Sequence, residues 1–575
     1  MNARPWLCWW LALASLCFPA LDARAEGGLA LDASTAGASA PDGPAIGTGV
    51  SDPGGLTLGA STESGQAIEV LAGNRMSAAA SEIFGKEMYR HASVSVMVTD
   101  ISGAEPRPVF SLNPDMALST ASTAKLVTTA TALEVLGPDF RFDTRLYADG
   151  TMEQGTLHGN LWIVPDGDPS LGSEYISAAP KTFLSDWTEA LQRAGIHRVE
   201  GCLLLLSGRY AEPVPSTWLW EDMGNYYASG VFDAAVYDNM YRLYLRSGKN
   251  RSDAGNSVDR PKSGEIPDDR TRPEVSEAPD DGVGLAIFKA GDGLAEPEVE
   301  VVSVQPPLPR ISFDNRLKVY DKQQDSVYIY GAPRQWRRTL YGCMPAGQEH
   351  FCVKGDIPDP EQYLLDVVAA ALADSGFGRL ETAVSDVGPR SRWTLVARTL
   401  SPPLSELIRV TNVYSNNQYA EYLFRRTAWA LAREANCEKP GLTESRSIDW
   451  VRRFWASRGL DVGAWFLADG CGLSPRTAMS ASALVELLCR EAGSERGGEL
   501  RRSLPLAGKE GTVAGFGRSL SGECRLKSGS MSAVRTYAGY YAKDGHSYVF
   551  ALMVNRFDGP SRRVQSDLEA LLRCL

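Results

Sequence analysis

The sequence of 575 residues has few metal-binding residues and lacks long apolar runs. Its five histidines are scattered and it contains no CxxC pair, so we expect no metal site and no other cofactor. Beyond the first 25 residues, no stretch approaches the roughly 18 apolar residues that span a bilayer, so we expect no transmembrane anchor. The formal net charge is −12, which argues against nucleic acid or an anionic membrane as the main partner.

The N-terminus has the pattern of a secretory signal peptide. Arg4 precedes an apolar run over 6–18, and Ala23-Arg24-Ala25 is a small-x-small cleavage site. We therefore predict a signal peptide over 1–25, cleaved near Ala25, and export of the mature chain to the periplasm.

Eight of the ten cysteines lie beyond this signal. An even number of cysteines in an exported protein permits disulfide bonds. Cys343 and Cys352 are close enough in sequence to bridge a hairpin, and we predict that they do.

Composition divides the rest of the chain into segments. Residues 26–77 are rich in Gly, Ala, Ser and Thr, which predicts a flexible linker. Residues 146–395 are dominated by strand patterns and are interpreted as a β-rich region of one or two subdomains, with a disordered loop at about 247–283. The flanking segments, 78–145 and 396–575, mix helical and strand patterns. The length fits two to four domains.

Ser122 and Lys125 are the first candidate site residues. They lie three apart at the start of an apolar helical run, 126–136, which Gly137-Pro138 closes. Residues at this spacing share a helix face, so the hydroxyl and the amine can meet. A serine alcohol needs a base to act as a nucleophile, and a lysine with a lowered pKa can serve. The pair alone is not diagnostic, because Ser and Lys at this spacing occur on many solvated helices.

Two later motifs follow this pair in order. Ser415-Asn416-Asn417 fits S-x-N in a break between predicted helices over 404–413 and 418–435. Lys527-Ser528-Gly529 fits K-[ST]-G on a predicted strand. Each motif alone has a plain structural explanation, as a turn or a solvated strand residue. The ordered set of three in an exported chain predicts acyl transfer by a serine nucleophile.

With these motifs the sequence resembles the penicillin-binding protein 4 type of D-alanyl-D-alanine carboxypeptidase/endopeptidase, the S13 peptidases. About 290 residues separate Lys125 from Ser415, far more than in the β-lactamases and smaller carboxypeptidases that share the motif set. Four further blocks resemble the family: 167–171, 220–227, 469–474 and 504–512. The resemblance implies a mixed α+β fold, in which a transpeptidase-like (serine β-lactamase-like) domain of antiparallel sheet plus helices, 78–145 and 396–575, is split by the inserted region 146–395.

Chemistry and resemblance together assign roles. Ser122 would attack the carbonyl of a D-Ala–D-Ala bond while Lys125 accepts its proton. Ser415 would relay protons, Asn417 would bond to the substrate amide and Lys125, and Lys527 would lower the Lys125 pKa and attract the terminal carboxylate. The implied substrate-binding residues are Ser528, Gly529, Ser530, Asp222 and Tyr227, the last two for a diaminopimelate-type side chain. The implied partners are peptidoglycan peptides and, as covalent inhibitors, β-lactams.

Three positions depart from the family pattern. Ser528 replaces the usual Thr of K-T-G, and Cys471 replaces a common Ser. Pro475, followed by Arg476, stands where the family often has an Arg that helps to hold the side-chain carboxylate of the substrate, which puts that contact in question. Two alternatives stay open: a β-lactamase or esterase, which needs fast deacylation, and a low-turnover penicillin-binding scaffolding protein whose inserted region binds a partner.

Overall fold

The computed structural model describes residues 63–248, 298–320, 326–389, 392–437 and 439–575. The predicted signal peptide over 1–25 and nearly all of the loop predicted at 247–283 lie outside these residues. Among the described helices, none is both long and apolar enough to cross a membrane.

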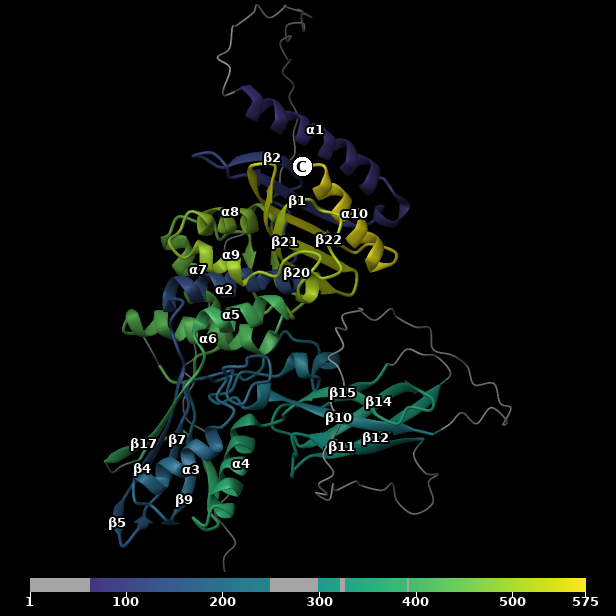
Figure 1. Cartoon of the computed structure of the whole chain (residues 1–575). Coiled ribbons are helices and arrows are strands. Elements are labelled where there is room, and N and C mark those ends of the chain that lie inside the picture. The colour runs from purple at the N-terminus through teal and green to yellow at the C-terminus, as the bar shows by residue number, and fades with distance from the viewer. Residues whose placement is uncertain (1–62, 249–297, 321–325, 390–391, 438) are drawn as a thin grey trace, which may run out of the picture. The chain divides into compact units, whose positions relative to one another are not determined.

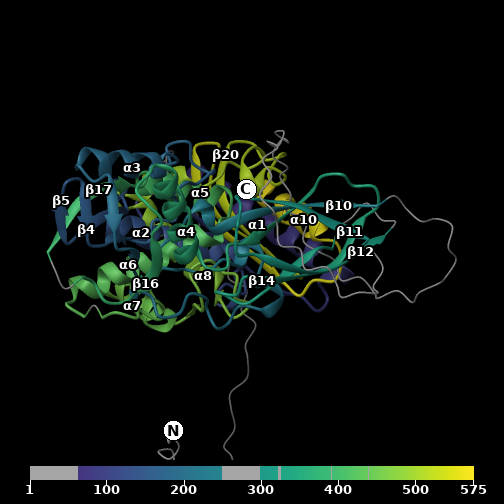
Figure 2. The ribbon, with the colours of Figure 1, turned by 90° about the horizontal axis from the view of Figure 1, so that it is seen from below.

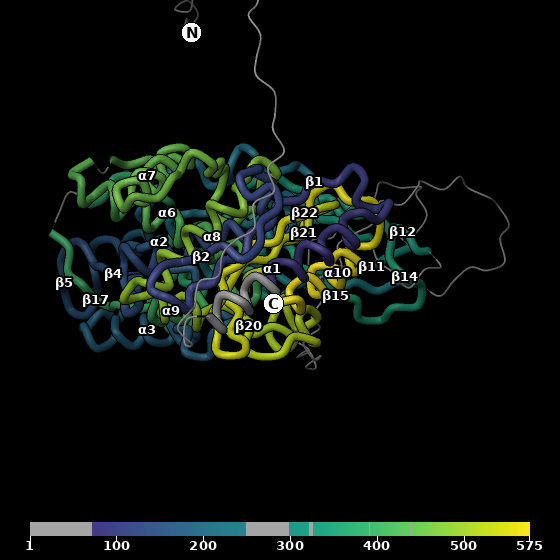
Figure 3. Tube along the Cα trace, turned by 90° about the horizontal axis from the view of Figure 1, so that it is seen from above, coloured from purple at the N-terminus to yellow at the C-terminus, as the bar shows by residue number. Residues whose placement is uncertain are grey.

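The described chain begins with helix α1 (Glu63–Phe84), which lies beside strand β2 (Arg107–Leu112) and the C-terminal helix α10 (Ser561–Arg573) (Figure 3). The prediction of a flexible linker is therefore wrong for residues 63–77. Composition favoured a linker because Ala and Ser are frequent there, but Met76, Ala80 and Ile83 recur at helical spacing and are buried. This apolar stripe packs into the core beneath the neighbouring sheet and stabilises the helix.

Strands from the two ends of the described chain form one antiparallel sheet of order β2-β1-β22-β21-β20 (Figure 1). Its other strands are β1 (Ser93–Asp100), β20 (Glu523–Met531), β21 (Val534–Lys543) and β22 (His546–Asn555). The central strand β22 is buried on both faces, since Ala551 packs with one layer of helices and Leu552 with α1 and α10. Asp544-Gly545 forms the two-residue turn between β21 and β22, and both residues have the positive φ that such a turn requires.

A second layer of helices covers the other face of the sheet. Helix α8 (Ala481–Ala492) contacts β1 and β22, and α2 (Lys125–Leu136) lies within the layer. The helix predicted over 126–136 is confirmed, because Leu126, Ala130 and Leu133 are fully buried and Gly137 ends the helix with φ +84°. The remaining helices of the layer are α5 (Leu404–Val413), α6 (Asn417–Glu434), α7 (Glu444–Ser457) and α9 (Gly497–Ser503), of which the first two match the helices predicted over 404–413 and 418–435.

The chain between α2 and α5 contains a second five-stranded sheet, of order β16-β9-β7-β4-β17, with helices α3 and α4 against it (Figure 1). The bounds are β4 (Asp143–Asp149), β7 (Leu161–Val164), α3 (Phe183–Arg193), β9 (Cys202–Leu206), α4 (Pro360–Asp374), β16 (Glu381–Ser385) and β17 (Trp393–Leu400). A small sheet of β5 (Thr151–Glu153), β6 (Thr156–His158) and β8 (Arg198–Glu200) accompanies it.

Two three-stranded sheets complete this region, with orders β11-β10-β15 and β12-β14-β13; several of their strands are labelled on the right of Figure 2. Their strands are β10 (Met240–Ser247), β11 (Val299–Gln305), β12 (Ser312–Tyr320), β13 (Tyr328–Tyr330), β14 (Arg337–Pro345) and β15 (Phe351–Asp356). All three larger sheets of the region contribute to one continuous hydrophobic core, so its parts fold against each other.

Short elements connect these layers and position the motifs. Three two-residue strands pair as β18-β19-β3. Their bounds, and those of the short 3₁₀ helices, are β3 (Leu118–Ser119), β18 (Trp465–Phe466), β19 (Ala478–Met479), η1 (Glu87–Tyr89), η2 (Ala121–Ala124), η3 (Trp220–Asp222), η4 (Tyr226–Ala228), η5 (Tyr237–Asn239) and η6 (Gly511–Val513).

The predicted disulfide between Cys343 and Cys352 is wrong. Both thiols are free, as are the other six described cysteines. Cys343 lies in β14, which pairs with β12 and β13, whereas Cys352 lies in β15, which pairs with β10. The two strands belong to different sheets, so the nearness of the cysteines in sequence does not make them a hairpin pair.

Candidate active site

Ser122 lies in η2, one turn before α2, and the residue preceding it is held in an uncommon backbone conformation. Ala121 has φ +42° and is fully buried. A non-glycine residue with positive φ persists only where its surroundings fix it. Here the carbonyl oxygen of Thr120 accepts a hydrogen bond of 2.7 Å from Thr536 Oγ1 on β21. The sheet therefore fixes the turn that presents the serine.

Two glycines allow other segments to approach this turn closely. A Cβ at Gly472 would lie 2.0 Å from the carbonyl oxygen of Ala121. A Cβ at Gly529 on β20 would lie 2.2 Å from Thr536 Oγ1 and 3.0 Å from the backbone nitrogen of Ser122. The glycine of the K-[ST]-G motif thus leaves room for β20 beside the serine.

Lys125 is fully buried and its amine connects three segments of the chain. Its Nζ lies 2.9 Å from Ser122 Oγ, 2.6 Å from Asn417 Oδ1 and 2.7 Å from the carbonyl oxygen of Cys471. Burial lowers the Lys125 pKa, and the nearby Cys471, Asp469 and Glu421 partly oppose that shift. Resemblance and charge predict that the Lys527 ammonium lowers this pKa, but burial is the largest cause of the shift.

The partners of Lys125 also orient it as a base. An amide oxygen and a backbone carbonyl can only accept hydrogen bonds, so a neutral amine directs its two N–H groups to Asn417 and Cys471. Its lone pair then points to the remaining partner, the hydroxyl of Ser122. The geometry therefore favours transfer of the Ser122 proton to Lys125.

The three residues of the S-x-N motif have different partners: two of them bond to lysines and one caps a helix. Ser415, with φ +55°, accepts a hydrogen bond of 2.9 Å from Nζ of the fully buried Lys527. Asn416 caps α6 by accepting from the backbone N–H of Tyr419, and Asn417 bonds to Lys125. The first and third residues of the motif thus each bond to a candidate catalytic lysine, and the middle residue caps the helix.

Strand β20 carries the third motif at the edge of its sheet. Lys527 Nζ also donates to the carbonyl oxygen of Ser528, and Ser528 Oγ lies 2.7 Å from Thr512 Oγ1. Ser530 is partly exposed two residues farther along the strand. The sheet order places β20 at an edge, so the backbone beside Ser530 can pair with an extended peptide.

The structure also brings the predicted side-chain pocket to this centre. Asn417 Nδ2 donates to the carbonyl oxygen of Tyr227 at 2.8 Å, and the Tyr227 hydroxyl donates to Asp222. Burial raises the pKa of Asp222 to about 6. Pro475 and Arg476 are both exposed. All ten residues named from the sequence are thus arranged around Ser122 or along β20 and the loop at 222–227.

Sequence reasoning missed the support beneath Lys125. Asp469 is buried and accepts hydrogen bonds from the backbone of Gly472 and Ser474 and from the Thr477 and Trp218 side chains. Glu421 on α6 accepts from the backbone N–H of Gly470 at 2.8 Å. These bonds fix the loop whose Cys471 carbonyl holds Lys125. The resemblance of residues 469–474 to the family indicated that this block matters, but it did not show that the Cys471 carbonyl oxygen is the atom that contacts Lys125.

Within the part of the chain that the structure describes, three residues beneath Lys125 are grouped closely enough to be tested as a metal site. Potential ligand atoms of Glu421, Asp469 and Cys471 lie within 4.8 Å of one another. Burial raises the pKa of both Glu421 and Cys471, which favours their protonated, hydrogen-bonding forms over anionic ligands. Both oxygens of Asp469 already accept hydrogen bonds. The three side chains therefore fit a structural network better than a metal centre.

A half-buried serine hydrogen-bonded to a buried lysine, between an antiparallel sheet and a helical layer, has the arrangement of serine–lysine acyl-transfer hydrolases. The chain belongs to the S13 peptidase family: the model for D-Ala-D-Ala carboxypeptidase 3 (S13) matches residues 77–268 and 293–573. The predicted family and the predicted mixed α+β fold are confirmed.

Individual relatives are distant but match along most of their length. The D-alanyl-D-alanine carboxypeptidase DacB of Haemophilus influenzae is 24% identical over 446 residues, which cover 76% of this chain and 80% of that protein. The D-alanyl-D-alanine carboxypeptidase of an Actinomadura species is 24% identical over 491 residues, covering 83% and 80%. The crystal structure of penicillin binding protein 4 from Haemophilus influenzae superimposes with a TM-score of 0.67 at 20% identity, covering 86% of this chain and 97% of that one. A second structure of that protein contains a β-lactam.

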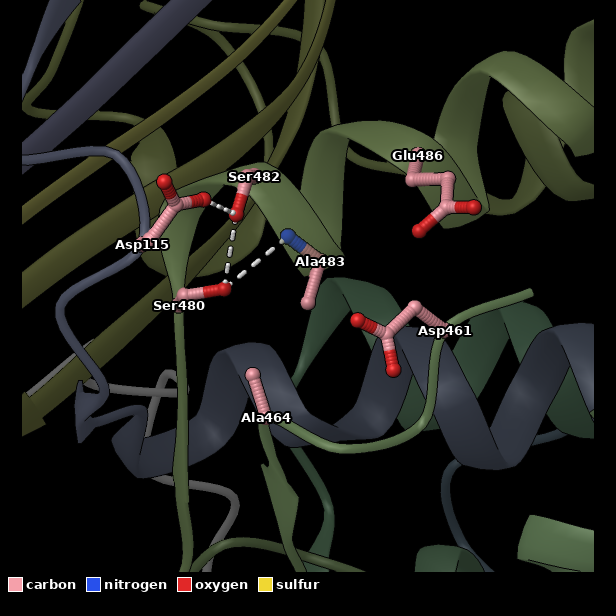
Figure 4. A pocket seen from close by; sticks show the side chains of 7 residues that line it. All are labelled: Asp115, Asp461, Ala464, Ser480, Ser482, Ala483 and Glu486. Carbon is pink, nitrogen blue, oxygen red and sulfur yellow. Dashed lines mark hydrogen bonds between the residues drawn. The ribbon is translucent and has the colours of Figure 1, made fainter.

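A separate cavity of about 160 Å³ is lined by acidic side chains. Figure 4 shows Asp115, Asp461 and Glu486 around it, with Ser480 and Ser482 at the start of α8. Ser482 Oγ donates to Asp115 Oδ1 at 2.7 Å. Burial and the neighbouring Asp461 raise the pKa of Glu486. Its ionised form is therefore less stable in the folded protein than in the unfolded chain.

We expect Glu486→Gln to raise the melting temperature at pH 7. The pKa of Glu486 is higher in the folded protein than in the unfolded chain. The free energy of unfolding therefore falls as pH rises from the unfolded pKa through the folded pKa. The gain should be small, below about 1 kcal/mol, because the group is partly solvated, and it should vanish below about pH 4. Thermal unfolding at pH 7 and pH 4 measures it. The exposed Glu495→Gln is the matched control, and an equal shift in both variants at pH 7 would contradict the prediction.

Proposed function

We propose that the chain is a periplasmic serine-type D-Ala-D-Ala carboxypeptidase/endopeptidase that acts on peptidoglycan peptides and is inhibited by β-lactams. One observation carries the proposal: the buried Lys125 amine meets Ser122 Oγ and two groups that can only accept hydrogen bonds. Family membership and the names of the relatives support the substrate class. The β-lactam bound to the Haemophilus influenzae protein supports the inhibition.

The proposed reaction begins with Ser122. Its oxygen attacks the carbonyl carbon of the D-Ala–D-Ala bond while its proton moves to neutral Lys125. The C–N bond breaks, and the leaving amine takes a proton from Ser415, whose hydroxyl Lys527 reprotonates. The backbone N–H groups of Ser122 and Ser530 would hold the developing oxyanion, where losing one donor costs roughly 3–4 kcal/mol. Water then attacks the ester carbonyl and gives a proton to Lys527 by way of Ser415, while the Ser122 oxygen leaves and takes its proton back from Lys125.

Strand β20 is the proposed binding edge for the substrate backbone. An extended peptide would pair with the strand beside Gly529 and Ser530, and its terminal carboxylate would meet Lys527 and the hydroxyl of Ser528. The close approach of β20 to Ser122 supports this placement. We also propose the domain division 78–145 with 396–575, split by 146–395, which the sheet shared by β1, β2 and β20–β22 supports.

We propose that Asp222 and Tyr227 bind the ammonium group of a diaminopimelate side chain, and that Lys354 binds its carboxylate. Lys354 Nζ lies 5.4 Å from the centre of the Tyr226 ring, which packs edge-on against Tyr227 at 5.5 Å. Lys354 thus offers a cation near the pocket, whereas Pro475 occupies the position of the family arginine. Sequence reasoning missed Lys354 because it lies on β15, far from every motif.

Side-chain variants test this pocket with two peptides. We expect Asp222→Asn to raise KM about tenfold for pentapeptides containing either diaminopimelate or lysine, since a charge-assisted hydrogen bond is lost. Lys354→Met should raise KM for the diaminopimelate peptide alone, because lysine lacks the carboxylate. Binding should also weaken below about pH 6 as Asp222 is protonated. Equal effects of Lys354→Met on both peptides would refute its role.

The function itself is tested with protein lacking residues 1–25. We expect release of D-alanine from a diaminopimelate pentapeptide and covalent labelling by penicillin. Labelling without release would indicate the penicillin-binding scaffolding alternative, and rapid penicillin turnover would indicate a β-lactamase. Absence of labelling would contradict the whole proposal.

A further inference from the structure

Five aromatic side chains form a surface that begins at the candidate site, and of these only Tyr227 has a role in the proposed function. We call it the aromatic surface; its residues are Trp220, Tyr227, Tyr328, Tyr330 and Tyr341. They come from η3, η4 and the adjacent strands β13 and β14. Trp220 is 64% exposed and Tyr341 is 58% exposed. Large exposed aromatic groups that adjoin one another indicate a binding surface, whereas single ones do not.

Strand pairing explains why the tyrosines of β13 and β14 face solvent together. Tyr328 is opposite Tyr341 in the antiparallel pair, and alternation places Tyr330 on the same face. The Tyr328 and Tyr330 rings are nearly parallel with centres 6.0 Å apart, and Tyr330 lies 6.5 Å from Tyr341. The intervening Ile329 is buried in the core on the opposite face. A packed sheet thus fixes these rings, of which Tyr341 is exposed and Tyr328 and Tyr330 are half-buried.

The surface is continuous with the candidate active site. Helix η3 contacts β13, and Tyr227 lies near enough to Tyr328 for their hydroxyls to interact electrostatically. The backbone carbonyl of Tyr227 accepts a hydrogen bond from Asn417, whose other amide atom contacts Lys125. A molecule bound to these rings would therefore adjoin a substrate bound at Ser122.

The chemistry of the surface favours a neutral, hydroxyl-rich ligand. Aromatic faces stack on the apolar faces of sugar rings, and tyrosine hydroxyls can bond to their polar edges. Glu221 interacts electrostatically with Tyr330, and on the neighbouring strand β12 Asp314 pairs with Arg316 and Arg337, so charges of both signs lie beside the rings and neither sign dominates. A carboxylate also accepts hydrogen bonds from sugar hydroxyls and acetamido groups.

We propose that the aromatic surface binds the amino-sugar chain that carries the substrate peptide. The inference rests on the proposed function, because a peptidoglycan peptide reaches Ser122 covalently attached to such a chain. Sugar binding would hold the peptide at the site and lower its KM without changing the chemical step. Trp220 and Tyr341, the most exposed rings, would be the main contacts.

Kinetics on two substrates test the proposal. We expect wild-type protein to show a KM about tenfold lower for a disaccharide-linked pentapeptide than for the free pentapeptide, at similar kcat. The double variant Trp220→Ala/Tyr341→Ala should raise the first KM to the second and leave the free peptide unaffected. Leu395→Ala, which removes a half-exposed apolar side chain from β17, is the control and should change neither. Both aromatic positions are exposed, so the melting temperature should stay at the wild-type value.

A peptide-free probe separates this inference from the proposed function. Chitotetraose should quench or shift the tryptophan fluorescence of the wild-type protein and of Leu395→Ala, but bind at least tenfold more weakly to the double variant. Equal KM values for the two substrates in the wild type, or no chitotetraose binding, would overturn the inference while peptide hydrolysis stands. An equal loss on both substrates in the double variant would show that the surface binds the peptide instead. Chitotetraose binding without hydrolysis of either substrate would refute only the proposed function.

Discussion

Ser122→Ala should abolish covalent labelling by penicillin and lower D-alanine release at least about a thousandfold. The proposed acyl-enzyme needs the Ser122 oxygen, and no other hydroxyl occupies its place beside Lys125 in the described part of the chain. The hydroxyl is a small part of the packing around η2, so the variant should fold. Release of D-alanine and mass spectrometry after incubation with penicillin measure the two effects.

Ser119→Ala is the matched control for this substitution. Ser119 lies three residues earlier, and its hydroxyl makes a long contact of 3.8 Å with the Met531 sulfur. The control should keep labelling and release within about twofold of wild type. A labelled Ser122→Ala protein, with the mass adduct on another residue, would show that the nucleophile has been misassigned.

Lys125→Arg should lower kcat/KM by about two to four orders of magnitude and remove the acid limb of its pH profile. Lys125 must be neutral to accept the Ser122 proton, and burial lowers its pKa toward the working range. As pH falls through that pKa the amine is protonated, so wild-type activity falls on the acid side. A guanidinium stays protonated throughout, so the variant has no base to titrate.

A second variant guards against a simple packing effect. Lys125→Met keeps most of the side-chain volume but leaves Asn417 Oδ1 and the Cys471 carbonyl without their donor, which should cost about 1–3 kcal/mol of stability. Both variants should lose activity although unfolding curves show them folded. An acid limb that persists unchanged in Lys125→Arg would show that another group is the base.

The three motifs could be found from the sequence because each depends on local chemistry. Ser122 and Lys125 meet across one helical turn, and Asn416 caps the helix that presents Asn417. Asp544-Gly545 specified its hairpin because only residues that accept positive φ fit the turn. These are short-range effects, and they fixed both the family and the order of the catalytic elements.

Predictions that used nearness in sequence or composition failed where tertiary packing decides. Cys343 and Cys352 are nine positions apart, yet their strands join different sheets. Residues 63–77 have the composition of a linker, but they belong to helix α1, whose buried apolar residues pack into the core beneath the sheet. In both cases the structure depends on which distant segment packs against the residues, and a local sequence pattern does not indicate that segment.

The sequence by itself determined which residues can perform acyl transfer and the elements that carry them. Only the tertiary structure decided that the Lys125 amine is fully buried, and that the Cys471 carbonyl and Asn417 leave its lone pair for Ser122. The same holds for Lys354 beside Tyr226 and for the tyrosines of β13 and β14 near Tyr227. The reason is physical: burial and hydrogen-bond direction arise from segments far apart in the chain, and they set the pKa of a lysine and the reach of a binding surface.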